Sequence, residues 1–144
     1  MAGIIGAIRK DIRVETPANV ANGIYYKSFS SNSVAQSKGL VKFSSGHIIN
    51  CVDNDTKCSG FLIHNLTTDN ARGTCCVAPG MFVEMKIKSG ETFSDADIGS
   101  GFGIHDHETI DPSDTTNKIF VLQSYDNSAD YCVGSIYPSA MEPA

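Results

Sequence analysis

From about Gly23 to Pro138, short apolar runs alternate with clusters of Gly, Asn, Asp, Ser and Pro. No stretch in this range repeats its apolar residues with the period of a long amphipathic helix. The runs recur at a spacing of roughly 8–12 residues, which is typical of the strands in β-sandwiches and β-barrels. The sequence therefore predicts an all-β fold, a single antiparallel β-barrel or β-sandwich of about eight or nine strands with an N-terminal arm.

Nine segments have the composition of strands, being rich in β-branched, aromatic and other apolar residues. They are 23–29, 39–43, 47–52, 60–66, 74–78, 81–87, 101–107, 118–125 and 131–137. Segments 39–43 and 47–52 flank a short Ser-Ser-Gly loop, so we expect them to form a hairpin. Segment 81–87 alternates cleanly, which predicts a half-buried antiparallel strand. One face would carry Met81, Val83, Met85 and Ile87, and the other Phe82, Glu84 and Lys86.

The first 22 residues differ from the rest of the chain. Ile4, Ile8 and Ile12 recur at every fourth position with Ile5 beside them, which is the pattern of one helical face. Pro17 would end a helix before it. We expect an arm over 1–22, partly helical or extended, followed by a β domain over 23–138 and a tail over 139–144. The isoleucines should be buried in the chain's own core by default, or otherwise in a partner.

Charge is distributed unevenly along the 144 residues. The first 45 residues carry a net charge of +4 and the remaining 99 carry −9, which together give the overall −5. An acidic body argues against binding nucleic acid, because phosphate contacts need a basic face. A basic end on an acidic body suggests docking to a neighbouring copy or to an acidic partner surface. A solvated charge distribution with no partner is the alternative.

The sequence also bears on the compartment in which the chain is made. No apolar run approaches the roughly 20 residues of a membrane-spanning helix, and the first residues become charged too early for a secretory signal. An odd number of cysteines without an export signal predicts reduced, buried thiols. The five are Cys51, Cys58, Cys75, Cys76 and Cys132. We therefore expect the chain to be cytosolic when it is made.

The segment Gly99–His107 holds the sharpest motif, a glycine followed after five residues by His-x-His. It resembles the first half of the first cupin motif, in which two histidines and a following glutamate bind a metal inside a small β-barrel. Where that glutamate should fall, this chain has Asp111 or Pro112, and no histidine follows His107. The sequence favours two surface histidines at a polar strand end. A cupin-like metal-binding enzyme or sensor using His105 and His107 is the alternative.

Two other groups of residues suggest binding. A carbohydrate- or receptor-binding sandwich could use tyrosines as stacking faces, although tyrosines in strands more often belong to a core or its rim. These are Tyr25, Tyr26, Tyr125, Tyr131 and Tyr137.

An acidic stretch offers the oxygen ligands that calcium takes, but its spacing is not that of an EF-hand, so solvated loops are expected. It comprises Asp95, Asp97, Asp106, Glu108, Asp111 and Asp114. No complete catalytic, cofactor or metal site is predicted.

Two stretches, 39–65 and 77–104, are similar to the decoration (cement) proteins of tailed-phage capsids. In that group, units formed by Pro/Ala-Gly, an alternating strand and x-Gly-Glu/Asp recur, together with a closing strand pair like 118–137. The resemblance implies a non-enzymatic virion structural protein on the capsid exterior. It would bind the major capsid protein at symmetry axes, often as a homotrimer, without a cofactor, nucleic acid or membrane. The arm would supply the interface, through Ile4, Ile5, Ile8, Arg9, Lys10, Ile12 and Arg13.

Overall fold

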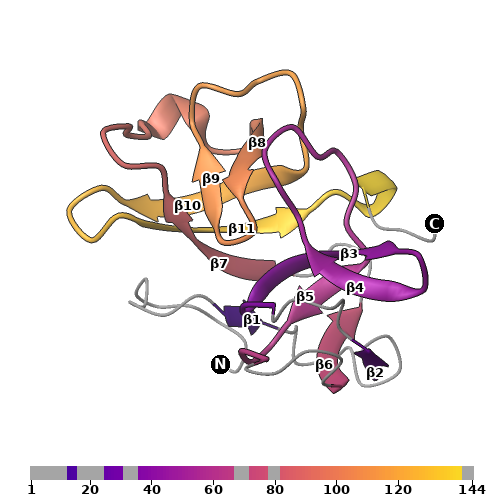
Figure 1. The fold of residues 1–144 in the computed structure, drawn as a ribbon. Coiled ribbons are helices and arrows are strands. Elements are labelled where there is room, and N and C mark those ends of the chain that lie inside the picture. The colour runs from indigo at the N-terminus through magenta and orange to yellow at the C-terminus, as the bar shows by residue number, and fades with distance from the viewer. Residues whose placement is uncertain (1–12, 16–24, 31–35, 67–71, 78–81, 141–144) are drawn as a thin grey trace.

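The computed structural model of the chain describes residues 13–15, 25–30, 36–66, 72–77 and 82–140 (Figure 1). Within these residues there are eleven β-strands and two single-turn 3-10 helices, so the predicted all-β class is confirmed. The strands are β1 (Arg13–Glu15), β2 (Tyr25–Ser30), β3 (Gly39–Ser44), β4 (His47–Asn50), β5 (Gly60–Leu62), β6 (Arg72–Val77), β7 (Phe82–Ile87), β8 (Gly101–Asp106), β9 (Thr109–Asp111), β10 (Phe120–Asp126) and β11 (Tyr131–Ile136). The helices are η1 (Asp95–Asp97) and η2 (Pro138–Ala140).

The first sheet closes into a barrel. Its strand order is β1-β7-β11-β10-β8-β9, and an additional pairing joins β7 to β9, so β7, β11, β10, β8 and β9 form a closed ring of five strands. All pairings in this sheet are antiparallel except that between β7 and β9. Closure removes the open strand edges that otherwise invite pairing with other chains. The choice that the sequence left open, barrel or sandwich, is therefore decided in favour of a barrel.

Strand β1 lies outside this ring. Along one edge of β7 the partner is β11, while the other edge is shared, with β1 pairing at Phe82–Glu84 and β9 pairing at Lys86–Ile87. The ring is therefore complete without β1, which adds a sixth strand to the same sheet.

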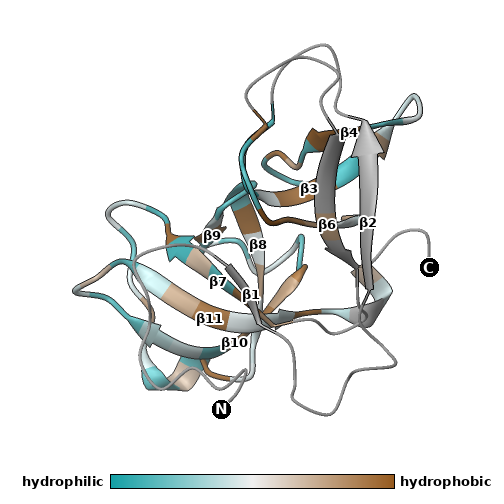
Figure 2. Ribbon diagram, turned by 90° about the horizontal axis from the view of Figure 1, so that it is seen from below, coloured by the Kyte–Doolittle hydropathy of each residue, from teal (hydrophilic) through white to brown (hydrophobic). Residues whose placement is uncertain are grey.

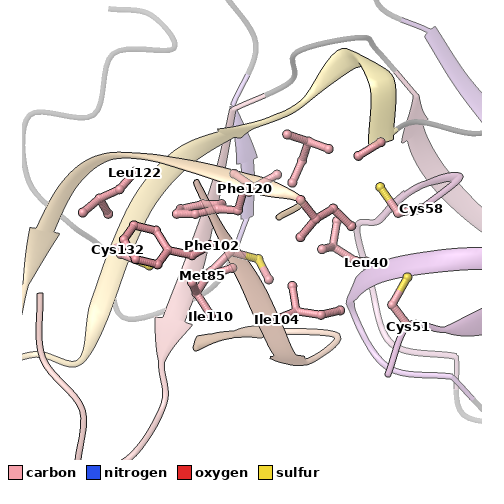
Figure 3. Close-up of a cluster of buried hydrophobic side chains, with 14 of the residues drawn as sticks. Leu40, Cys51, Cys58, Met85, Phe102, Ile104, Ile110, Phe120, Leu122 and Cys132 are labelled. Carbon is pink, nitrogen blue, oxygen red and sulfur yellow. The ribbon is translucent and has the colours of Figure 1, made fainter. Parts of the chain in front are cut away.

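Apolar side chains fill the barrel. Val83, Met85 and Ile87 of β7 are buried in the main core cluster, as the alternation of the segment predicts. Figure 3 shows Met85 among residues from the other strands of the ring, including Phe102, Ile104, Ile110, Phe120, Leu122 and Cys132. Phe93, from the loop after β7, packs edge-on against Phe102 with ring centroids 5.0 Å apart. The interior is thus a packed core.

The second sheet has the order β2-β6-β5-β3-β4, with every pairing antiparallel. The expected hairpin is present as β3 and β4. The edge strands β2 and β4 come close to one another, so the sheet curls around a second cluster. This cluster consists of Val41, Ile48, Leu62, Leu66 and Cys75.

The two sheets share the main core, as Leu40 and Phe61 of the second sheet belong to the barrel's cluster. Figure 2 shows the second sheet lying beside the barrel, and Figure 3 shows Leu40, Cys51 and Cys58 facing the barrel residues. The amide of Leu40 donates a hydrogen bond to the carbonyl of His107 over 2.8 Å. The amide of Cys58 donates one to the carbonyl of Ala140, also over 2.8 Å.

Several details differ from the sequence-based expectations. The described residues hold eleven strands because β1 and β9, each of three residues, add to the nine predicted segments. Segment 60–66 forms a strand only over Gly60–Leu62. The arm expected over 1–22 lies outside the described residues except for β1, and residues 141–144 of the expected tail lie outside them too. The proposed boundaries of arm, domain and tail stay predictions.

Candidate functional site

The predicted interface meets the barrel at β1. Of its seven residues, only Arg13 lies in the part of the chain that the structure describes. Its backbone pairs with Glu84, followed by Val14 with Val83 and Glu15 with Phe82. The predicted residues outside the described part are Ile4, Ile5, Ile8, Arg9, Lys10 and Ile12.

Glu84 is the unusual residue at this junction. Its neighbours Val83 and Met85 face the core, so the alternation of the strand turns Glu84 to the outer face of the barrel. Glu84 was therefore expected to face solvent, yet it has 0% of its surface exposed. Burial of a carboxylate is costly unless a positive charge or hydrogen bonds compensate it.

The ladder places a cationic residue and an apolar residue on either side of Glu84. Arg13 of β1 and Val133 of β11 are both its direct cross-strand partners. Residues directly opposite each other share a face, with Cβ atoms about 4.5–5.5 Å apart. Val133 is likewise buried, with 5% exposed. Val133, Glu84 and Arg13 thus form a row across three neighbouring strands, and Arg13 lies on the outermost of them, β1.

The direction of β1 determines where the rest of the arm begins. Because β1 runs antiparallel to β7, Arg13 lies at the end nearest Lys86, which is paired with Thr109 at the start of β9. Asp106 ends β8 and Glu108 lies in the turn before β9, where it forms an ion pair with Lys86 at 2.9 Å. Arg13 therefore lies at the end of β1 that is nearer to these carboxylates.

The two histidines of the His-x-His motif do not form a ligand cluster. His105, on β8, is exposed, and His107, in the turn after β8, is half-buried. The backbone of His107 packs closely against Gly39, so a Cβ atom at position 39 would overlap the carbonyl oxygen of His107. Within the described ranges, no three His, Cys, Asp or Glu residues are grouped to hold a metal ion. His107 instead helps to join the barrel to the second sheet.

The acidic loops use their carboxylates as backbone caps. Asp114 accepts hydrogen bonds from the amides of Thr116 and Asn117 at 3.0 and 2.9 Å, and Asp106 accepts one from Glu108 at 2.9 Å. Burial raises the pKa of Asp114 while the hydrogen bonds from Asn117 and Thr116 lower it, and the net shift is downward. These contacts are those of ordinary polar loops. Asp111 departs from the expected solvated loops, because it is buried in β9 and its carboxylate lies 3.4 Å from the ammonium group of Lys88.

Tyrosines form part of the rim of the core. Tyr125, Tyr131 and Tyr137 are half-buried against the main cluster. The hydroxyl of Tyr125 donates to Asp95 over 2.7 Å, and this hydrogen bond raises the pKa of Tyr125. Of Tyr25 and Tyr26 only the backbone, in β2, is described. The three described rings are committed to packing, which does not favour a stacking site for a sugar.

The cysteines behave as small apolar residues, as expected. Cys51, Cys58, Cys75 and Cys132 are buried, while the side chain of Cys76 lies outside the described part. Burial raises the pKa of both Cys51 and Cys132. A thiol with a raised pKa is protonated at neutral pH and is a poor nucleophile.

Comparison with protein-family models, curated proteins and solved structures found no match to this chain. Among the described residues, no helix has both the length and the apolar character to cross a membrane. The β1–β7 junction was missed from the sequence because Glu84 fits a solvent-facing position of an alternating strand. The charge contrast between the first 45 residues and the rest, together with the isoleucine pattern of the first 12, was the signal that pointed to this region.

Proposed function

We propose that the protein is a non-enzymatic structural component of a tailed-phage virion, which decorates the capsid exterior and stabilises it by binding the major capsid protein lattice. The observation that carries this proposal is the attachment of the arm. The barrel ring closes without β1, and the basic arm joins an acidic barrel through this accessory strand alone among the described elements. The chain before Arg13 is therefore not needed to complete the ring.

The body of the molecule suits a particle component. The ring is closed, its interior is packed with apolar side chains, and its long loops are held by carboxylate caps. A closed ring around a packed core favours resistance to unfolding and to proteolysis. These features support a structural role.

The arm has the chemistry of a docking element. Ile4, Ile8 and Ile12 would bury apolar surface against the lattice, contributing about 25 cal/mol per Å². Arg9 and Lys10 would steer the arm towards an acidic shell. Several copies, as a homotrimer or another homo-oligomer at a symmetry axis, would bind together more tightly than one copy alone.

Co-sedimentation with empty, expanded capsid shells of the phage that encodes the protein tests this function. A variant lacking residues 2–12 keeps β1 and the ring, so its circular dichroism and Tm should match the full chain. We expect it to lose at least 10-fold in affinity for the shells. A triple Ile4→Ser, Ile8→Ser, Ile12→Ser variant should behave in the same way, whereas deletion of residues 141–144 serves as the matched control. Undiminished binding after deletion of 2–12 would refute the role of the arm.

A further inference from the structure

We propose that β1 is an exchangeable strand, so that Arg13–Glu15 of one copy pairs with Phe82–Glu84 of a second copy and the arms link neighbouring copies. This inference rests on the proposed multi-copy assembly and names how its copies are joined. It concerns only residues of β1 and β7, and not the part of the arm that would contact the lattice.

The ring permits the exchange because it does not include β1. Five other strands close the barrel, and among the described residues β1 pairs with β7 alone. Moving β1 from one copy to another therefore breaks no pairing within the ring. The same backbone hydrogen bonds form in either arrangement, so local concentration and geometry decide between them.

The acceptor edge of β7 is specific for this strand. In the observed register Arg13 lies opposite the buried Glu84, and Glu15 lies opposite Phe82. A slip of one residue would place Val14 opposite Glu84 and turn every side chain of β1 to the other face. A slip of two residues would bring the carboxylate of Glu15 opposite Glu84, where like charges repel. The strand that fits the edge best is the chain's own β1, from either copy.

The tether is long enough for the exchange. Nine residues, 16–24, connect β1 to β2. An extended chain of that length spans about 30 Å, whereas the radius of gyration of a domain of this size is about 15 Å. Exchange is therefore limited to copies that lie in direct contact. Exchange should increase when copies lie side by side, as they would around a symmetry axis.

A disulfide trap tests the exchange directly. Val14 and Val83 are direct partners in the ladder, so Val14→Cys and Val83→Cys are placed on two separate full-length chains. The chains are mixed at high concentration, incubated and oxidised with a low-molecular-weight disulfide, which takes up the two electrons as it becomes two thiols. We expect a reducible product of twice the monomer mass, absent when either variant is oxidised alone. The peptide joining positions 14 and 83 identifies it by mass spectrometry.

The double variant, with both cysteines on one chain, is the positive control for the geometry. If it forms the intrachain disulfide while the mixed single variants give no product, in solution or on shells, the inference is wrong.

If the double variant does not react, native mass spectrometry of two deletion variants decides. Deleting 2–15 should then convert the oligomer to monomer while deleting 2–12 does not, and equal masses for the two deletions would overturn the inference. Because the 2–12 deletion retains β1, its shell binding reports on the proposed function separately.

Discussion

Arg13 of β1 lies directly opposite Glu84 of β7, and Glu84 is fully buried although its strand turns it to the outer face of the barrel. Arg13 belongs to the basic first part of the chain and Glu84 to the acidic remainder, and the two are direct partners in the β1–β7 ladder. This pairing gives a physical reason for the place at which the arm attaches, because a buried carboxylate favours a nearby cation.

Replacing either residue should show that the two are coupled. We expect Arg13→Gln and Glu84→Gln each to lower the free energy of unfolding by about 1–3 kcal/mol. The double variant should lose less than the sum, with a coupling of about 0.5–3 kcal/mol, since each single change removes the same interaction. Urea denaturation measures all three, with Lys118→Gln on the exposed surface as control. Strict additivity would show that the two side chains do not interact.

Gly134 should be intolerant of any side chain. A Cβ at this position of β11 would overlap the carbonyl oxygen of Val121 and lie 2.5 Å from the ring of Phe120. We expect Gly134→Ala to cost about 1–3 kcal/mol, since a packed core resists added atoms. Thermal denaturation should show a lowered Tm, while Gln123→Ala on the exposed side of β10 should change little. A Gly134→Ala variant as stable as the parent would mean that β10 and β11 can move apart at this position at little cost in free energy.

The buried thiols should make the protein less stable in alkali. Burial raises the pKa of Cys51 and Cys132, so above the ordinary thiol pKa of about 8.5 the unfolded chain loses protons that the folded chain keeps. The contribution of these thiols to the free energy of unfolding is complete below about pH 8.5. Above that pH it falls, and the two thiols together should cost about 3 kcal/mol between about pH 8.5 and pH 10.

Urea denaturation across that range under reducing conditions measures the slope, and Cys132→Ala should roughly halve it. Lys86 and Tyr125 also have raised pKa values, but their ordinary values near 10 place their effect at higher pH. A flat profile up to pH 10 would contradict the predicted burial of these thiols.

Metal removal should have no effect on stability. His105 is exposed, while His107 packs its backbone against Gly39, so the two do not converge on one ion. We expect the Tm to be the same with a chelator and with added zinc, and His105→Ala to behave like the parent. A stoichiometric transition metal in native mass spectra, lost in His105→Ala, would instead support the cupin-like alternative.

The sequence predicted those parts of the fold that depend on local patterns. The alternation of Val83, Met85 and Ile87 identified the core face of β7, and Ser45-Gly46 marked the β3–β4 hairpin. Closure of the barrel depends on the parallel pairing of Lys86–Ile87 with Thr109–Ile110, between segments far apart in the chain. No local pattern specifies such a pairing, which explains why β9 and the choice of a barrel were not predicted.

The candidate site was predicted in the same partial way. Charge asymmetry drew attention to Arg13, but its pairing with Glu84 is set by the tertiary register. Three-residue strands such as β1 have too few residues for a periodic signal and form because a partner edge is available.

Cryo-electron microscopy of empty capsid shells incubated with the full-length protein tests the central claim most directly. The account predicts density for the barrel on the outer surface at a symmetry axis, with the arm directed into the lattice, and no such density when residues 2–12 are deleted. Bare shells at saturating protein, or equal occupancy with and without residues 2–12, would contradict it.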